Sequence, residues 1–531
     1  MATNLRDAIL AALAKLPGTR EFYLHVLVSA PRKHTELYQF AQPRPRTYLQ
    51  DILILLSEQK TPDSPRILVT AVEACVYVLP ATSCALLYVS KVDSTGFASA
   101  PTPTSTLVRT LLVYYGSPTT RPVAVDHVWI QLFARAQSQY LFPNSSEYPG
   151  KRPLSDAKLC AWWKRVLTDV ATELDSLITP RPLIRLHYIL PGMNELESFN
   201  ILKTSPTSTS DPYVWNYNHP YSQTEIPCPC PAPGDVQGST NLGHFIPYFD
   251  DDPKSRFMDE IAYITDKDGV KSPARKRPRK LSHTQTDREK ADAERPPSPK
   301  GTQTTPLGEL GKVSPDEFWE RMSFRQECVA GAVTGFFTLI LSAPLPASDR
   351  PTSRPSPLAP QPGQVSSQIN KRIMTSLTSG VEFSTEERAV RGTEAIEGAI
   401  KGLCEGLKAI PAVPITTIHA PRPLRASSPH DAGGGQTPDP SPYLALPRTP
   451  SPKLVNGKRA VPDVSPNPFP EPVVSLETYR SHIYGSVCVS NPPLKEPTEK
   501  GVGAIKENSN RNTDASGHVT LLTARRKKKR A

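Results

Sequence analysis

The chain has 531 residues and a net charge of +11 at pH 7, and 59 of its residues are proline, about twice the ordinary share. Its length allows two average domains, but only residues 1–265 have the continuous apolar and aromatic density of a folded domain. The positive charge predicts an acidic partner: a nucleic acid, an acidic protein or an anionic ligand. The best apolar run, residues 329–343, contains two glycines and is shorter than the roughly 18 residues of a transmembrane helix. We therefore expect a buried helix there and no membrane span.

The eight cysteines are scattered along a long chain, which indicates a reducing compartment. Cys228 and Cys230 are the only close pair, and no second pair follows at zinc spacing, which favours loop cysteines over a metal site. The apolar stretch at the N-terminus is too short for a signal peptide. A short amphipathic helix is expected instead, with one face made by Leu5, Ile9, Leu13 and Leu16.

The next elements along the chain predict a central sheet. Residues 21–28 are typical of a strand, and we expect a helix over residues 47–56. Two β-rich runs, residues 66–78 and 84–90, predict a hairpin. In the polar turn after this hairpin, Asp93 is on sequence alone more often a turn former than a functional carboxylate.

The segment of residues 134–146 mixes a cation, amide side chains and aromatics, which is unusual for a plain loop. Trp163 lies on the apolar face of the helix predicted after it, where an aromatic is more often core than cofactor contact. The elements expected around this segment are apolar runs at residues 107–115 and 128–133, a capped helix at residues 155–177 and a strand at residues 183–190.

Three carboxylates in a row, Asp250, Asp251 and Asp252, stand directly before Pro253 and Lys254. Asp252 is a good N-cap and Pro253 a good first helical residue, so the plainest interpretation is the start of a helix. Clustered carboxylates also raise one another's pKa, which prepares one of them to take a proton near neutrality. A metal site is another use of such a cluster.

Composition divides the chain into segments. The insertion described below contains a nuclear-localisation-like patch, residues 271–280, which could also be a solvated basic run. Beyond it we expect a helix that starts at Ser314 and leads into the apolar run, and further helices at residues 367–377 and 385–407. The domain boundaries expected are a folded domain over residues 1–265 and 311–410, a disordered basic insertion over residues 266–310, a Pro-rich loop over residues 344–366, and a disordered Pro/Ser/Lys-rich tail with a basic C-terminus over residues 411–531.

No Gly-rich phosphate loop, Ser-His-Asp order, zinc signature or Gly-x-x-Gly pyrophosphate turn is present. Composition and spacing alone support a basic α/β domain with an acidic site and disordered tails. Two functions from other classes remain open: a non-enzymatic chromatin or chaperone-binding adaptor, and a metal-dependent hydrolase that uses the Asp cluster. Metal enzymes usually draw their carboxylates from several parts of the fold, so the hydrolase is the less favoured of the two.

Several strings, in order along the chain, resemble the fungal-specific, chaperone-dependent histone H3 lysine acetyltransferases, the regulator of Ty transposition acetyltransferase family. The most specific are the Tyr-Leu-Phe-Pro string at residues 140–143 and the Asp-Asp-Pro-Lys-x-Arg-Phe string at residues 251–257. The other matching strings are residues 90–93 (Ser-Lys-Val-Asp), 139 and 144–146, 162–163 (Trp-Trp), 246–250, 318–319 with 325–327, and 383–387.

This resemblance implies an α/β fold with a central mixed β-sheet surrounded by helices, similar to the CREB-binding-protein acetyltransferase. It implies acetyl-CoA as cofactor and core and N-terminal tail lysines of histone H3 as acceptors. Activity in such a family is stimulated by histone chaperones and serves replication-coupled nucleosome assembly and genome stability in the nucleus. The implied partners are histone H3–H4 and chaperones with acidic surfaces, with no membrane and no sequence-specific nucleic acid.

The same resemblance assigns roles by position. Asp93, Trp163, Asp251 and Asp252 match catalytic-tunnel residues, and Lys254 matches a lysine that acetylates itself. No metal ligand is implied. The positions that match cofactor contacts are Val92, Asp93, Ser94, Pro101, Thr102, Pro103, Thr104, Ser105, Phe133, Arg135, Gln137, Arg152, Pro153, Leu154 and Trp162.

The chemistry of acetyl transfer fits these residue types. Arg135, Lys151 and Arg152 are available as donors to the phosphates of CoA. A thioester is attacked only by a neutral amine, whereas the usual pKa of lysine is about 10.4, so attack needs either proton removal, for which a carboxylate is suited, or a lysine that is already deprotonated. Trp163 would exclude water, and Asp93 would orient the tunnel or attract the ammonium. Which carboxylate is the base, if any of them is, stays open. Asp250 and the low charge of residues 101–105 depart from the family pattern.

Overall fold

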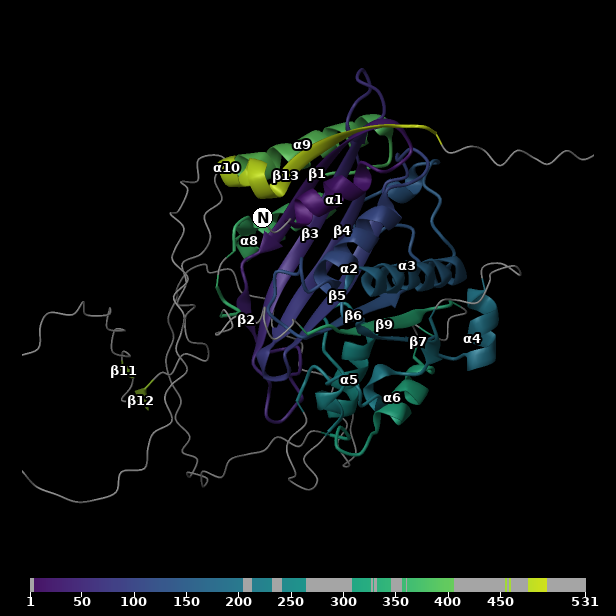
Figure 1. Ribbon diagram of the computed structural model, residues 1–531, viewed down its shortest axis with the longest axis vertical. Coiled ribbons are helices and arrows are strands. Elements are labelled where there is room, and N and C mark those ends of the chain that lie inside the picture. The colour runs from purple at the N-terminus through teal and green to yellow at the C-terminus, as the bar shows by residue number, and fades with distance from the viewer. Residues whose placement is uncertain are drawn as a thin grey trace, which may run out of the picture. The chain divides into compact units, whose positions relative to one another are not determined.

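A mixed sheet of eleven strands runs through the described part of the chain in the order β10-β1-β3-β4-β5-β6-β9-β7-β8, with β13 added beside β1 and β2 beside β3 (Figure 1). The computed structural model describes residues 4–203, 213–231, 241–263, 308–325, 328, 332–344, 356–359, 361–404, 454–455, 458–459 and 476–493. The expectation of an α/β fold with a central mixed sheet surrounded by helices is confirmed.

The strands of this sheet are β1 (Gly18–Ser29), β2 (Arg32–His34), β3 (Thr47–Gln59), β4 (Ile67–Leu79), β5 (Cys84–Ser94), β6 (His127–Ala134), β7 (Leu183–Ile189), β8 (Trp215–Tyr217), β9 (Gly335–Ser342), β10 (Gln364–Val365) and β13 (Tyr484–Asn491). A separate two-stranded ladder joins β11 (Leu454–Val455) to β12 (Lys458–Arg459). The helices are α1 (Leu5–Leu13), α2 (Thr104–Gly116), α3 (Asp156–Leu177), α4 (Glu195–Leu202), α5 (Pro253–Tyr263), α6 (Pro315–Met322), α8 (Ser367–Ser379), α9 (Glu386–Cys404) and α10 (Leu476–Thr478).

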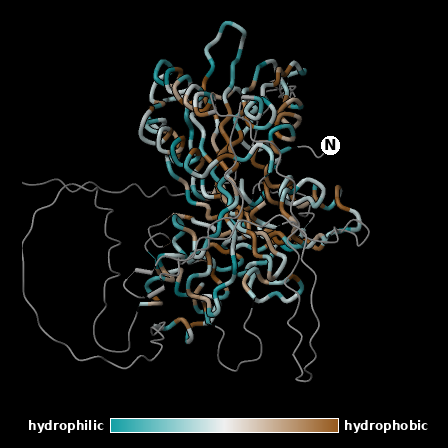
Figure 2. Tube along the Cα trace, turned by 90° about the vertical axis from the view of Figure 1, so that its left-hand side faces the viewer, coloured by the Kyte–Doolittle hydropathy of each residue, from teal (hydrophilic) through white to brown (hydrophobic). Residues whose placement is uncertain are grey.

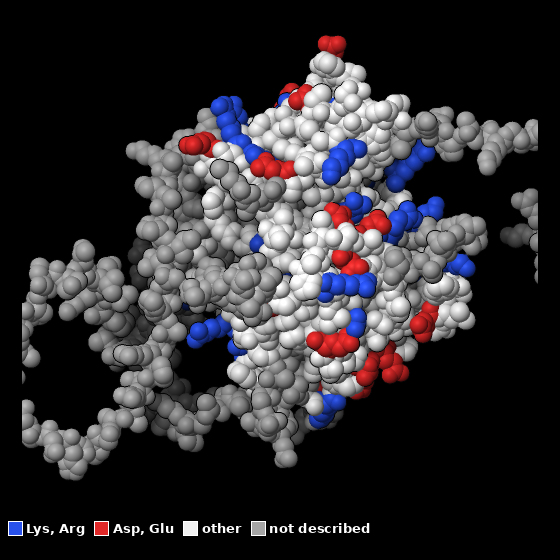
Figure 3. All heavy atoms as spheres, viewed as in Figure 1, with Lys and Arg blue, Asp and Glu red and all other residues white. Residues whose placement is uncertain are grey.

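The middle strands separate two hydrophobic cores because successive side chains point to opposite faces. On β5, Leu87 and Val89 enter the core that α1, α2 and α3 cover, whereas Leu86 and Tyr88 enter the core that α5 and α6 cover. Helices α8 and α9 pack against β1, β3 and β4. Figure 2 shows the apolar segments gathered in the interior of the trace. On the face that Figure 3 presents, acidic and basic side chains are intermingled.

The predicted hairpin is confirmed, since β4 and β5 pair as antiparallel neighbours. The helices expected near residues 5–16, 155–177, 253, 314, 367–377 and 385–407 are confirmed as α1, α3, α5, α6, α8 and α9. The strands expected at residues 21–28 and 183–190 correspond to β1 and β7.

Two expected helices are wrong. Residues 47–56 lie in the strand β3, which pairs with both β1 and β4. The described part of the apolar run 329–343 contains the strand β9, which pairs with both β6 and β7. Both strands are buried on their two faces. A strand buried on both faces has a continuous apolar pattern without a period of two, so it resembles a buried helix in the sequence.

The tail is not structureless throughout, which corrects the expectation for residues 411–531. Strand β13 pairs antiparallel with β1 along its first eight residues, from Gly18 opposite Asn491 to His25 opposite Tyr484. The Tyr479 hydroxyl is 3.0 Å from Nε2 of the buried His25. The basic insertion up to residue 307, its patch at residues 271–280 and the basic C-terminus fall outside the described residues, as does most of the Pro-rich loop.

Candidate active site

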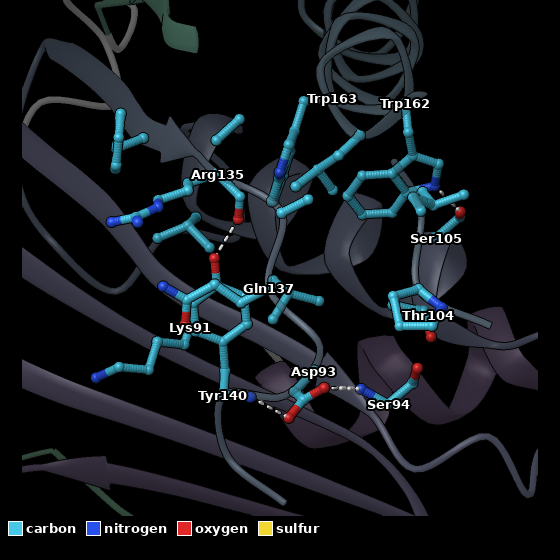
Figure 4. A pocket seen from close by; sticks show the side chains of 18 of the residues that line it. Lys91, Asp93, Ser94, Thr104, Ser105, Arg135, Gln137, Tyr140, Trp162 and Trp163 are labelled. Atoms are coloured by element: carbon cyan, nitrogen blue, oxygen red, sulfur yellow. Dashed lines mark hydrogen bonds between the residues drawn. The ribbon is translucent and has the colours of Figure 1, made fainter. Parts of the chain in front are cut away.

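A cavity of about 410 Å³ opens at the edge of the sheet where β5 and β6, which are parallel neighbours, both end. The N-terminal turns of α2 and α3 line its other side, and the loop after β6 contributes residues 135–137 and 140 to the lining (Figure 4). Parallel strands present their carboxyl ends to the same edge, which is where ligands bind in many α/β proteins. Its lining is made by residues 89–94, 102, 104, 105, 133–137, 140, 151–154, 159, 162 and 163.

Asp93 is the anchor of this cavity. Its Oδ2 accepts hydrogen bonds from the backbone N–H groups of Tyr140, Leu141 and Phe142 at 2.7, 2.8 and 3.1 Å. Its Oδ1 accepts from the backbone N–H of Ser94 at 2.8 Å and from Nζ of Lys151 at 2.9 Å. A carboxylate that accepts five hydrogen bonds fixes the loop around it, so Asp93 holds residues 140–142 against the end of β5.

Lys151 differs from its expected role as a phosphate donor. Its side chain is 5% exposed and is engaged by Asp93 and by the Ser145 hydroxyl at 2.8 Å. The backbone of Lys151 also lies against Gly96, where an added Cβ would be 2.6 Å from the Lys151 Cα. Gly96 has a φ of +92°, so glycine is required both by the backbone and by this close approach. Lys151 therefore stabilises the loop, and Arg152 beside it remains exposed at the rim.

An aromatic wall forms the side opposite β5. Trp162 and Trp163 lie in the first turns of α3 with their ring centroids 4.7 Å apart at an angle of 71°. The indole N–H of Trp162 donates to the Ser105 hydroxyl at 2.9 Å, which ties α3 to the first turn of α2. Trp163 is 5% exposed and belongs to the core, and it also lines the cavity. The core role and the cavity role are therefore compatible.

The loop after β6 is held at both ends of its segment 135–140. The Tyr140 hydroxyl donates to the carbonyl of Arg135, and the backbone N–H of Ala136 donates to Oδ1 of Asp156 at 3.1 Å. Burial raises the pKa of Tyr140 to about 12, so this hydroxyl keeps its proton at neutral pH. Asp156, at the start of α3, thus positions the loop.

The N-terminus of α2 is suited to an anion. Its N-cap, Pro103, makes no side-chain cap hydrogen bond, so the first-turn N–H groups lack a capping oxygen. Thr102, Thr104 and Ser105 of this turn line the cavity. Pro101 and Pro103 do not line it. Uncapped N–H groups and the positive end of a helix dipole bind phosphate groups.

The three carboxylates Asp250, Asp251 and Asp252 directly precede the helix α5. Oδ1 of Asp252 accepts the backbone N–H of Lys254 at 2.9 Å, which confirms the cap at the start of α5. Asp252 is fully buried, and its Oδ2 lies 2.5 Å from Nζ of Lys254, which is itself 3% exposed. The Lys254 ammonium is 4.5 Å from the centroid of the Phe336 ring. Burial lowers the pKa of Lys254, although the Asp252 carboxylate opposes this shift.

The Asp251 side chain does not point inward as that of Asp252 does. Its side chain is 65% exposed, and its Oδ2 lies 2.8 Å from Nζ of Lys91, a residue of the cavity lining. Nζ of Lys91 is also 2.8 Å from Oε2 of Glu73 on β4. Neither Asp251 nor Asp252 nor Lys254 lines the cavity directly. Asp251 adjoins it through Lys91.

Comparison with known proteins decides the family. The model of the histone acetyltransferase KAT11-type domain matches residues 118–398, more than half of the chain. The chain belongs to this family. The resemblance to the fungal histone H3 acetyltransferases is thereby confirmed.

This KAT11-type chain is similar to two curated proteins and to a series of solved structures. Histone acetyltransferase rtt109 of Aspergillus flavus is 30% identical over 307 residues, which cover 53% of this chain and 46% of that protein. The protein of the same name from Schizosaccharomyces pombe is 24% identical over 269 residues, covering 48% and 52%. The chain thus spans about half the length of these relatives. The crystal structure of Rtt109 from Aspergillus fumigatus shares the fold, with a TM-score of 0.56 and 22% identity over 75% of this chain and 96% of that one.

Within the KAT11-type fold, every position expected to contact the cofactor lines the cavity except Pro101 and Pro103. Lys91, Glu73 and Asp156 are members or supports of the site that were not predicted from the sequence. Lys91 could have been found, because it shares a strand face with Asp93. Among the described residues, no group of His, Cys, Asp or Glu is arranged to hold a metal ion. No helix in the described ranges is long and apolar enough to cross a membrane.

Proposed function

We propose that the protein is a histone lysine acetyltransferase that transfers the acetyl group of acetyl-CoA to core and N-terminal tail lysines of histone H3. The observation that carries this proposal is the cavity at the end of β5, where the uncapped start of α2, the Trp162–Trp163 wall and the loop anchored by Asp93 meet. Membership of the KAT11-type family supports the reaction class. Both curated relatives are named histone acetyltransferases, which supports histones as the substrate class.

The residues of the cavity fit acetyl-CoA. The first-turn N–H groups of α2 and the exposed guanidinium of Arg152 are donors for its phosphates. Phe133, Leu159 and Trp162 supply an apolar surface for its uncharged arm. When bound, acetyl-CoA supplies an acetyl group activated as a thioester.

Asp251 is the carboxylate that we assign as general base. Asp93 accepts five hydrogen bonds and Asp252 is buried against Lys254, whereas Asp251 is partly exposed beside the cavity. Asp251 takes the proton from the acceptor ammonium, which leaves the neutral amine that attack requires. Proton transfer to a positioned base typically contributes about 10²–10⁴-fold to the rate. Trp163 excludes water and favours the neutral form of the acceptor by desolvation.

Lys254 is proposed as a site of self-acetylation. Acetylation would remove a positive charge that is 3% exposed and whose burial lowers its pKa. A Lys254→Arg variant tests this role by mass spectrometry of the purified chain, acetyl-CoA affinity and turnover. Wild-type protein without acetyl-Lys254, or unchanged affinity and turnover in the variant, would rule the role out.

The proposed partners are histone H3–H4 and histone chaperones with acidic surfaces, in the nucleus, during replication-coupled nucleosome assembly. The net charge of +11 and the basic strings at residues 271–280 and 525–530 support acidic partners and a nuclear location.

The deciding experiment uses the full chain with labelled acetyl-CoA, histone H3–H4 and a histone chaperone, with and without EDTA. Label transfer that survives EDTA and falls about 10²–10⁴-fold in the Asp251→Asn variant is the expected result. Asp175→Asn, at an exposed ion pair with Arg181, is the matched control and should keep wild-type transfer. No transfer with any chaperone would leave the adaptor function, and EDTA-sensitive cleavage of a nucleic acid would indicate a hydrolase.

A further inference from the structure

Lys91 joins two carboxylates that come from distant parts of the chain. Its Nζ lies 2.8 Å from Oε2 of Glu73 and 2.8 Å from Oδ2 of Asp251. Glu73 faces Lys91 across the β4–β5 pair. The pairing then shifts, so that Ala74 faces Val89 and Ser90 is the extra residue of a bulge. A bulge redirects the side chains beside it, and here it places Lys91 opposite Glu73 at the end of β5.

This bridge lies between two hollows of the surface. Lys91 lines the cavity described above, whereas Glu73 and Asp251 line an adjoining groove of about 680 Å³. Ser90 lines both. In Figure 4, the Lys91 side chain extends away from Trp162 and Trp163. The bridge therefore stands where a side chain entering from the groove would approach the cavity.

Asp251 depends on Lys91 for its direction. Its side chain is 65% exposed, and it lies in the turn before α5 between two other carboxylates, Asp250 and Asp252. Asp252 is turned inward to Lys254. The backbone of this turn is fixed by Phe249, whose ring stacks on Tyr88 with centroids 3.8 Å apart, but that contact does not orient the Asp251 carboxylate.

Lys91 stays protonated at neutral pH. Burial disfavours the ammonium, but the Glu73 and Asp251 carboxylates outweigh this effect and raise the pKa of Lys91 above its usual value. A permanent ammonium is a constant hydrogen-bond donor to the Asp251 carboxylate at 2.8 Å.

We propose that Lys91 is the positioning residue for Asp251: held by Glu73 across the sheet, its ammonium directs the Asp251 carboxylate toward the cavity. The inference rests on the proposed function, in which a proton passes from the acceptor ammonium to the carboxylate of Asp251. Lys91 keeps its own proton throughout and only donates hydrogen bonds. A carboxylate aimed by a fixed donor is ready for this transfer, whereas a free one samples many directions.

The test is a double-mutant cycle in the full chain with acetyl-CoA and histone H3–H4. Lys91→Met keeps the length of the side chain and removes its charge. We expect kcat to fall about tenfold, because a misplacement of about 1 Å can cost as much as a hundredfold. Lys91→Arg, which keeps a cation that can reach both carboxylates, should recover most of this loss. Acetyl-CoA affinity and thermal stability should stay at the wild-type level in both.

The second arm of the cycle identifies the residue through which Lys91 acts. In the Asp251→Asn background, Lys91→Met should have no further effect on kcat, because the carboxylate that it directs is already gone. Lys60→Met, at an exposed lysine in the loop between β3 and β4, is the matched control for loss of one charge.

Four outcomes overturn the inference. They are an unchanged kcat in Lys91→Met, no recovery by arginine, additive losses in the double variant, and a loss of acetyl-CoA affinity that accounts for the whole defect. With transfer by the wild type intact, any of these overturns the role of Lys91 alone. No transfer by the wild type overturns the proposed function and this inference together.

Discussion

The Nζ atom of Lys254 lies 2.5 Å from Oδ2 of Asp252, and the two side chains are only 4% and 0% exposed. An ion pair so deeply buried gains attraction but loses hydration on both sides, so it contributes little net stability. Removing one partner is a different matter, since the other charge is then left buried without compensation.

Asp252→Asn should therefore lower the free energy of unfolding by about 3–5 kcal/mol, measured by chemical denaturation. Lys254→Met should cost less, because the Asp252 carboxylate keeps its bond from the backbone N–H of Lys254. The double variant should be more stable than Asp252→Asn alone. A double variant as unstable as Asp252→Asn would contradict the ion-pair argument.

The Asp252–Lys254 pair also predicts that the stability of the fold increases at alkaline pH. The pKa of folded Lys254 is lowered from the 10.5 of an ordinary lysine, so between these two values the unfolded chain binds more protons than the folded one. Stability then rises with pH through that window, and the cost of the buried ammonium is fully present below the folded pKa. Lys254→Met removes this group, so the stability advantage of the wild type over the variant should grow as the pH approaches 10.5. A difference independent of pH would be evidence against it.

Asp93→Asn tests the anchor of the cavity. Loss of its charge weakens the hydrogen bonds from residues 140–142 and leaves the Lys151 ammonium, 5% exposed, without its counter-charge. We expect about 3 kcal/mol less stability and at least about tenfold weaker acetyl-CoA binding by calorimetry. Asp175→Asn, which breaks an exposed pair, is the control and should leave both quantities unchanged. Wild-type affinity in Asp93→Asn would show that the loop is held by other contacts.

Prediction succeeded where burial leaves a visible period, as in helix α3, one face of which meets the core. Strand β1 was predicted although its residues 22–27 are buried on both faces. Strands β3 and β9 were taken for helices because both of their faces are buried. Burial on both sides erases the alternation that distinguishes a strand.

The residues that line the site were predicted from their positions in the matching sequence strings. The contacts between these residues were not predicted. The contact of Lys91 with Asp251 spans 160 residues, and no local pattern encodes such a pairing. Likewise, nothing in the string Lys-Arg-Pro-Leu at residues 151–154 distinguishes the buried lysine from the exposed arginine. In the fold, the Lys151 backbone lies against Gly96 and its ammonium contacts Asp93.

Substitution of Arg152 should therefore affect acetyl-CoA binding, whereas substitution of Lys151 should affect the stability of the fold. Arg152→Ala should weaken acetyl-CoA binding by about fivefold, reduce its dependence on salt and leave stability unchanged, because the guanidinium is exposed and free to meet a phosphate. Lys151→Met should lower stability by about 2 kcal/mol through its bond to Asp93. Isothermal titration at two salt concentrations and denaturant unfolding measure the two effects. Equal effects of both variants on cofactor affinity would reinstate Lys151 as a phosphate ligand.

Strand β13 should be an integral part of the fold. It covers β1 along eight paired residues, and Asn491 adds side-chain hydrogen bonds to the carbonyls of Ala14 and Leu16 at 2.8 and 2.7 Å. A chain that ends at Cys404 exposes this edge of β1, and an unpaired edge invites association with other chains. We expect its melting temperature to fall by at least about 5 °C and its oligomerisation to depend on concentration.

A chain that ends at Pro493 keeps β13 and is the matched control for this truncation. It should melt at the wild-type temperature and remain unassociated at the same concentration. A synthetic peptide of residues 476–493, added to the shorter chain, should restore part of the lost stability in a saturable way, because its strand pairs with β1 in a defined register. Equal melting temperatures for the two truncated chains would show that β13 adds nothing to the stability of the sheet.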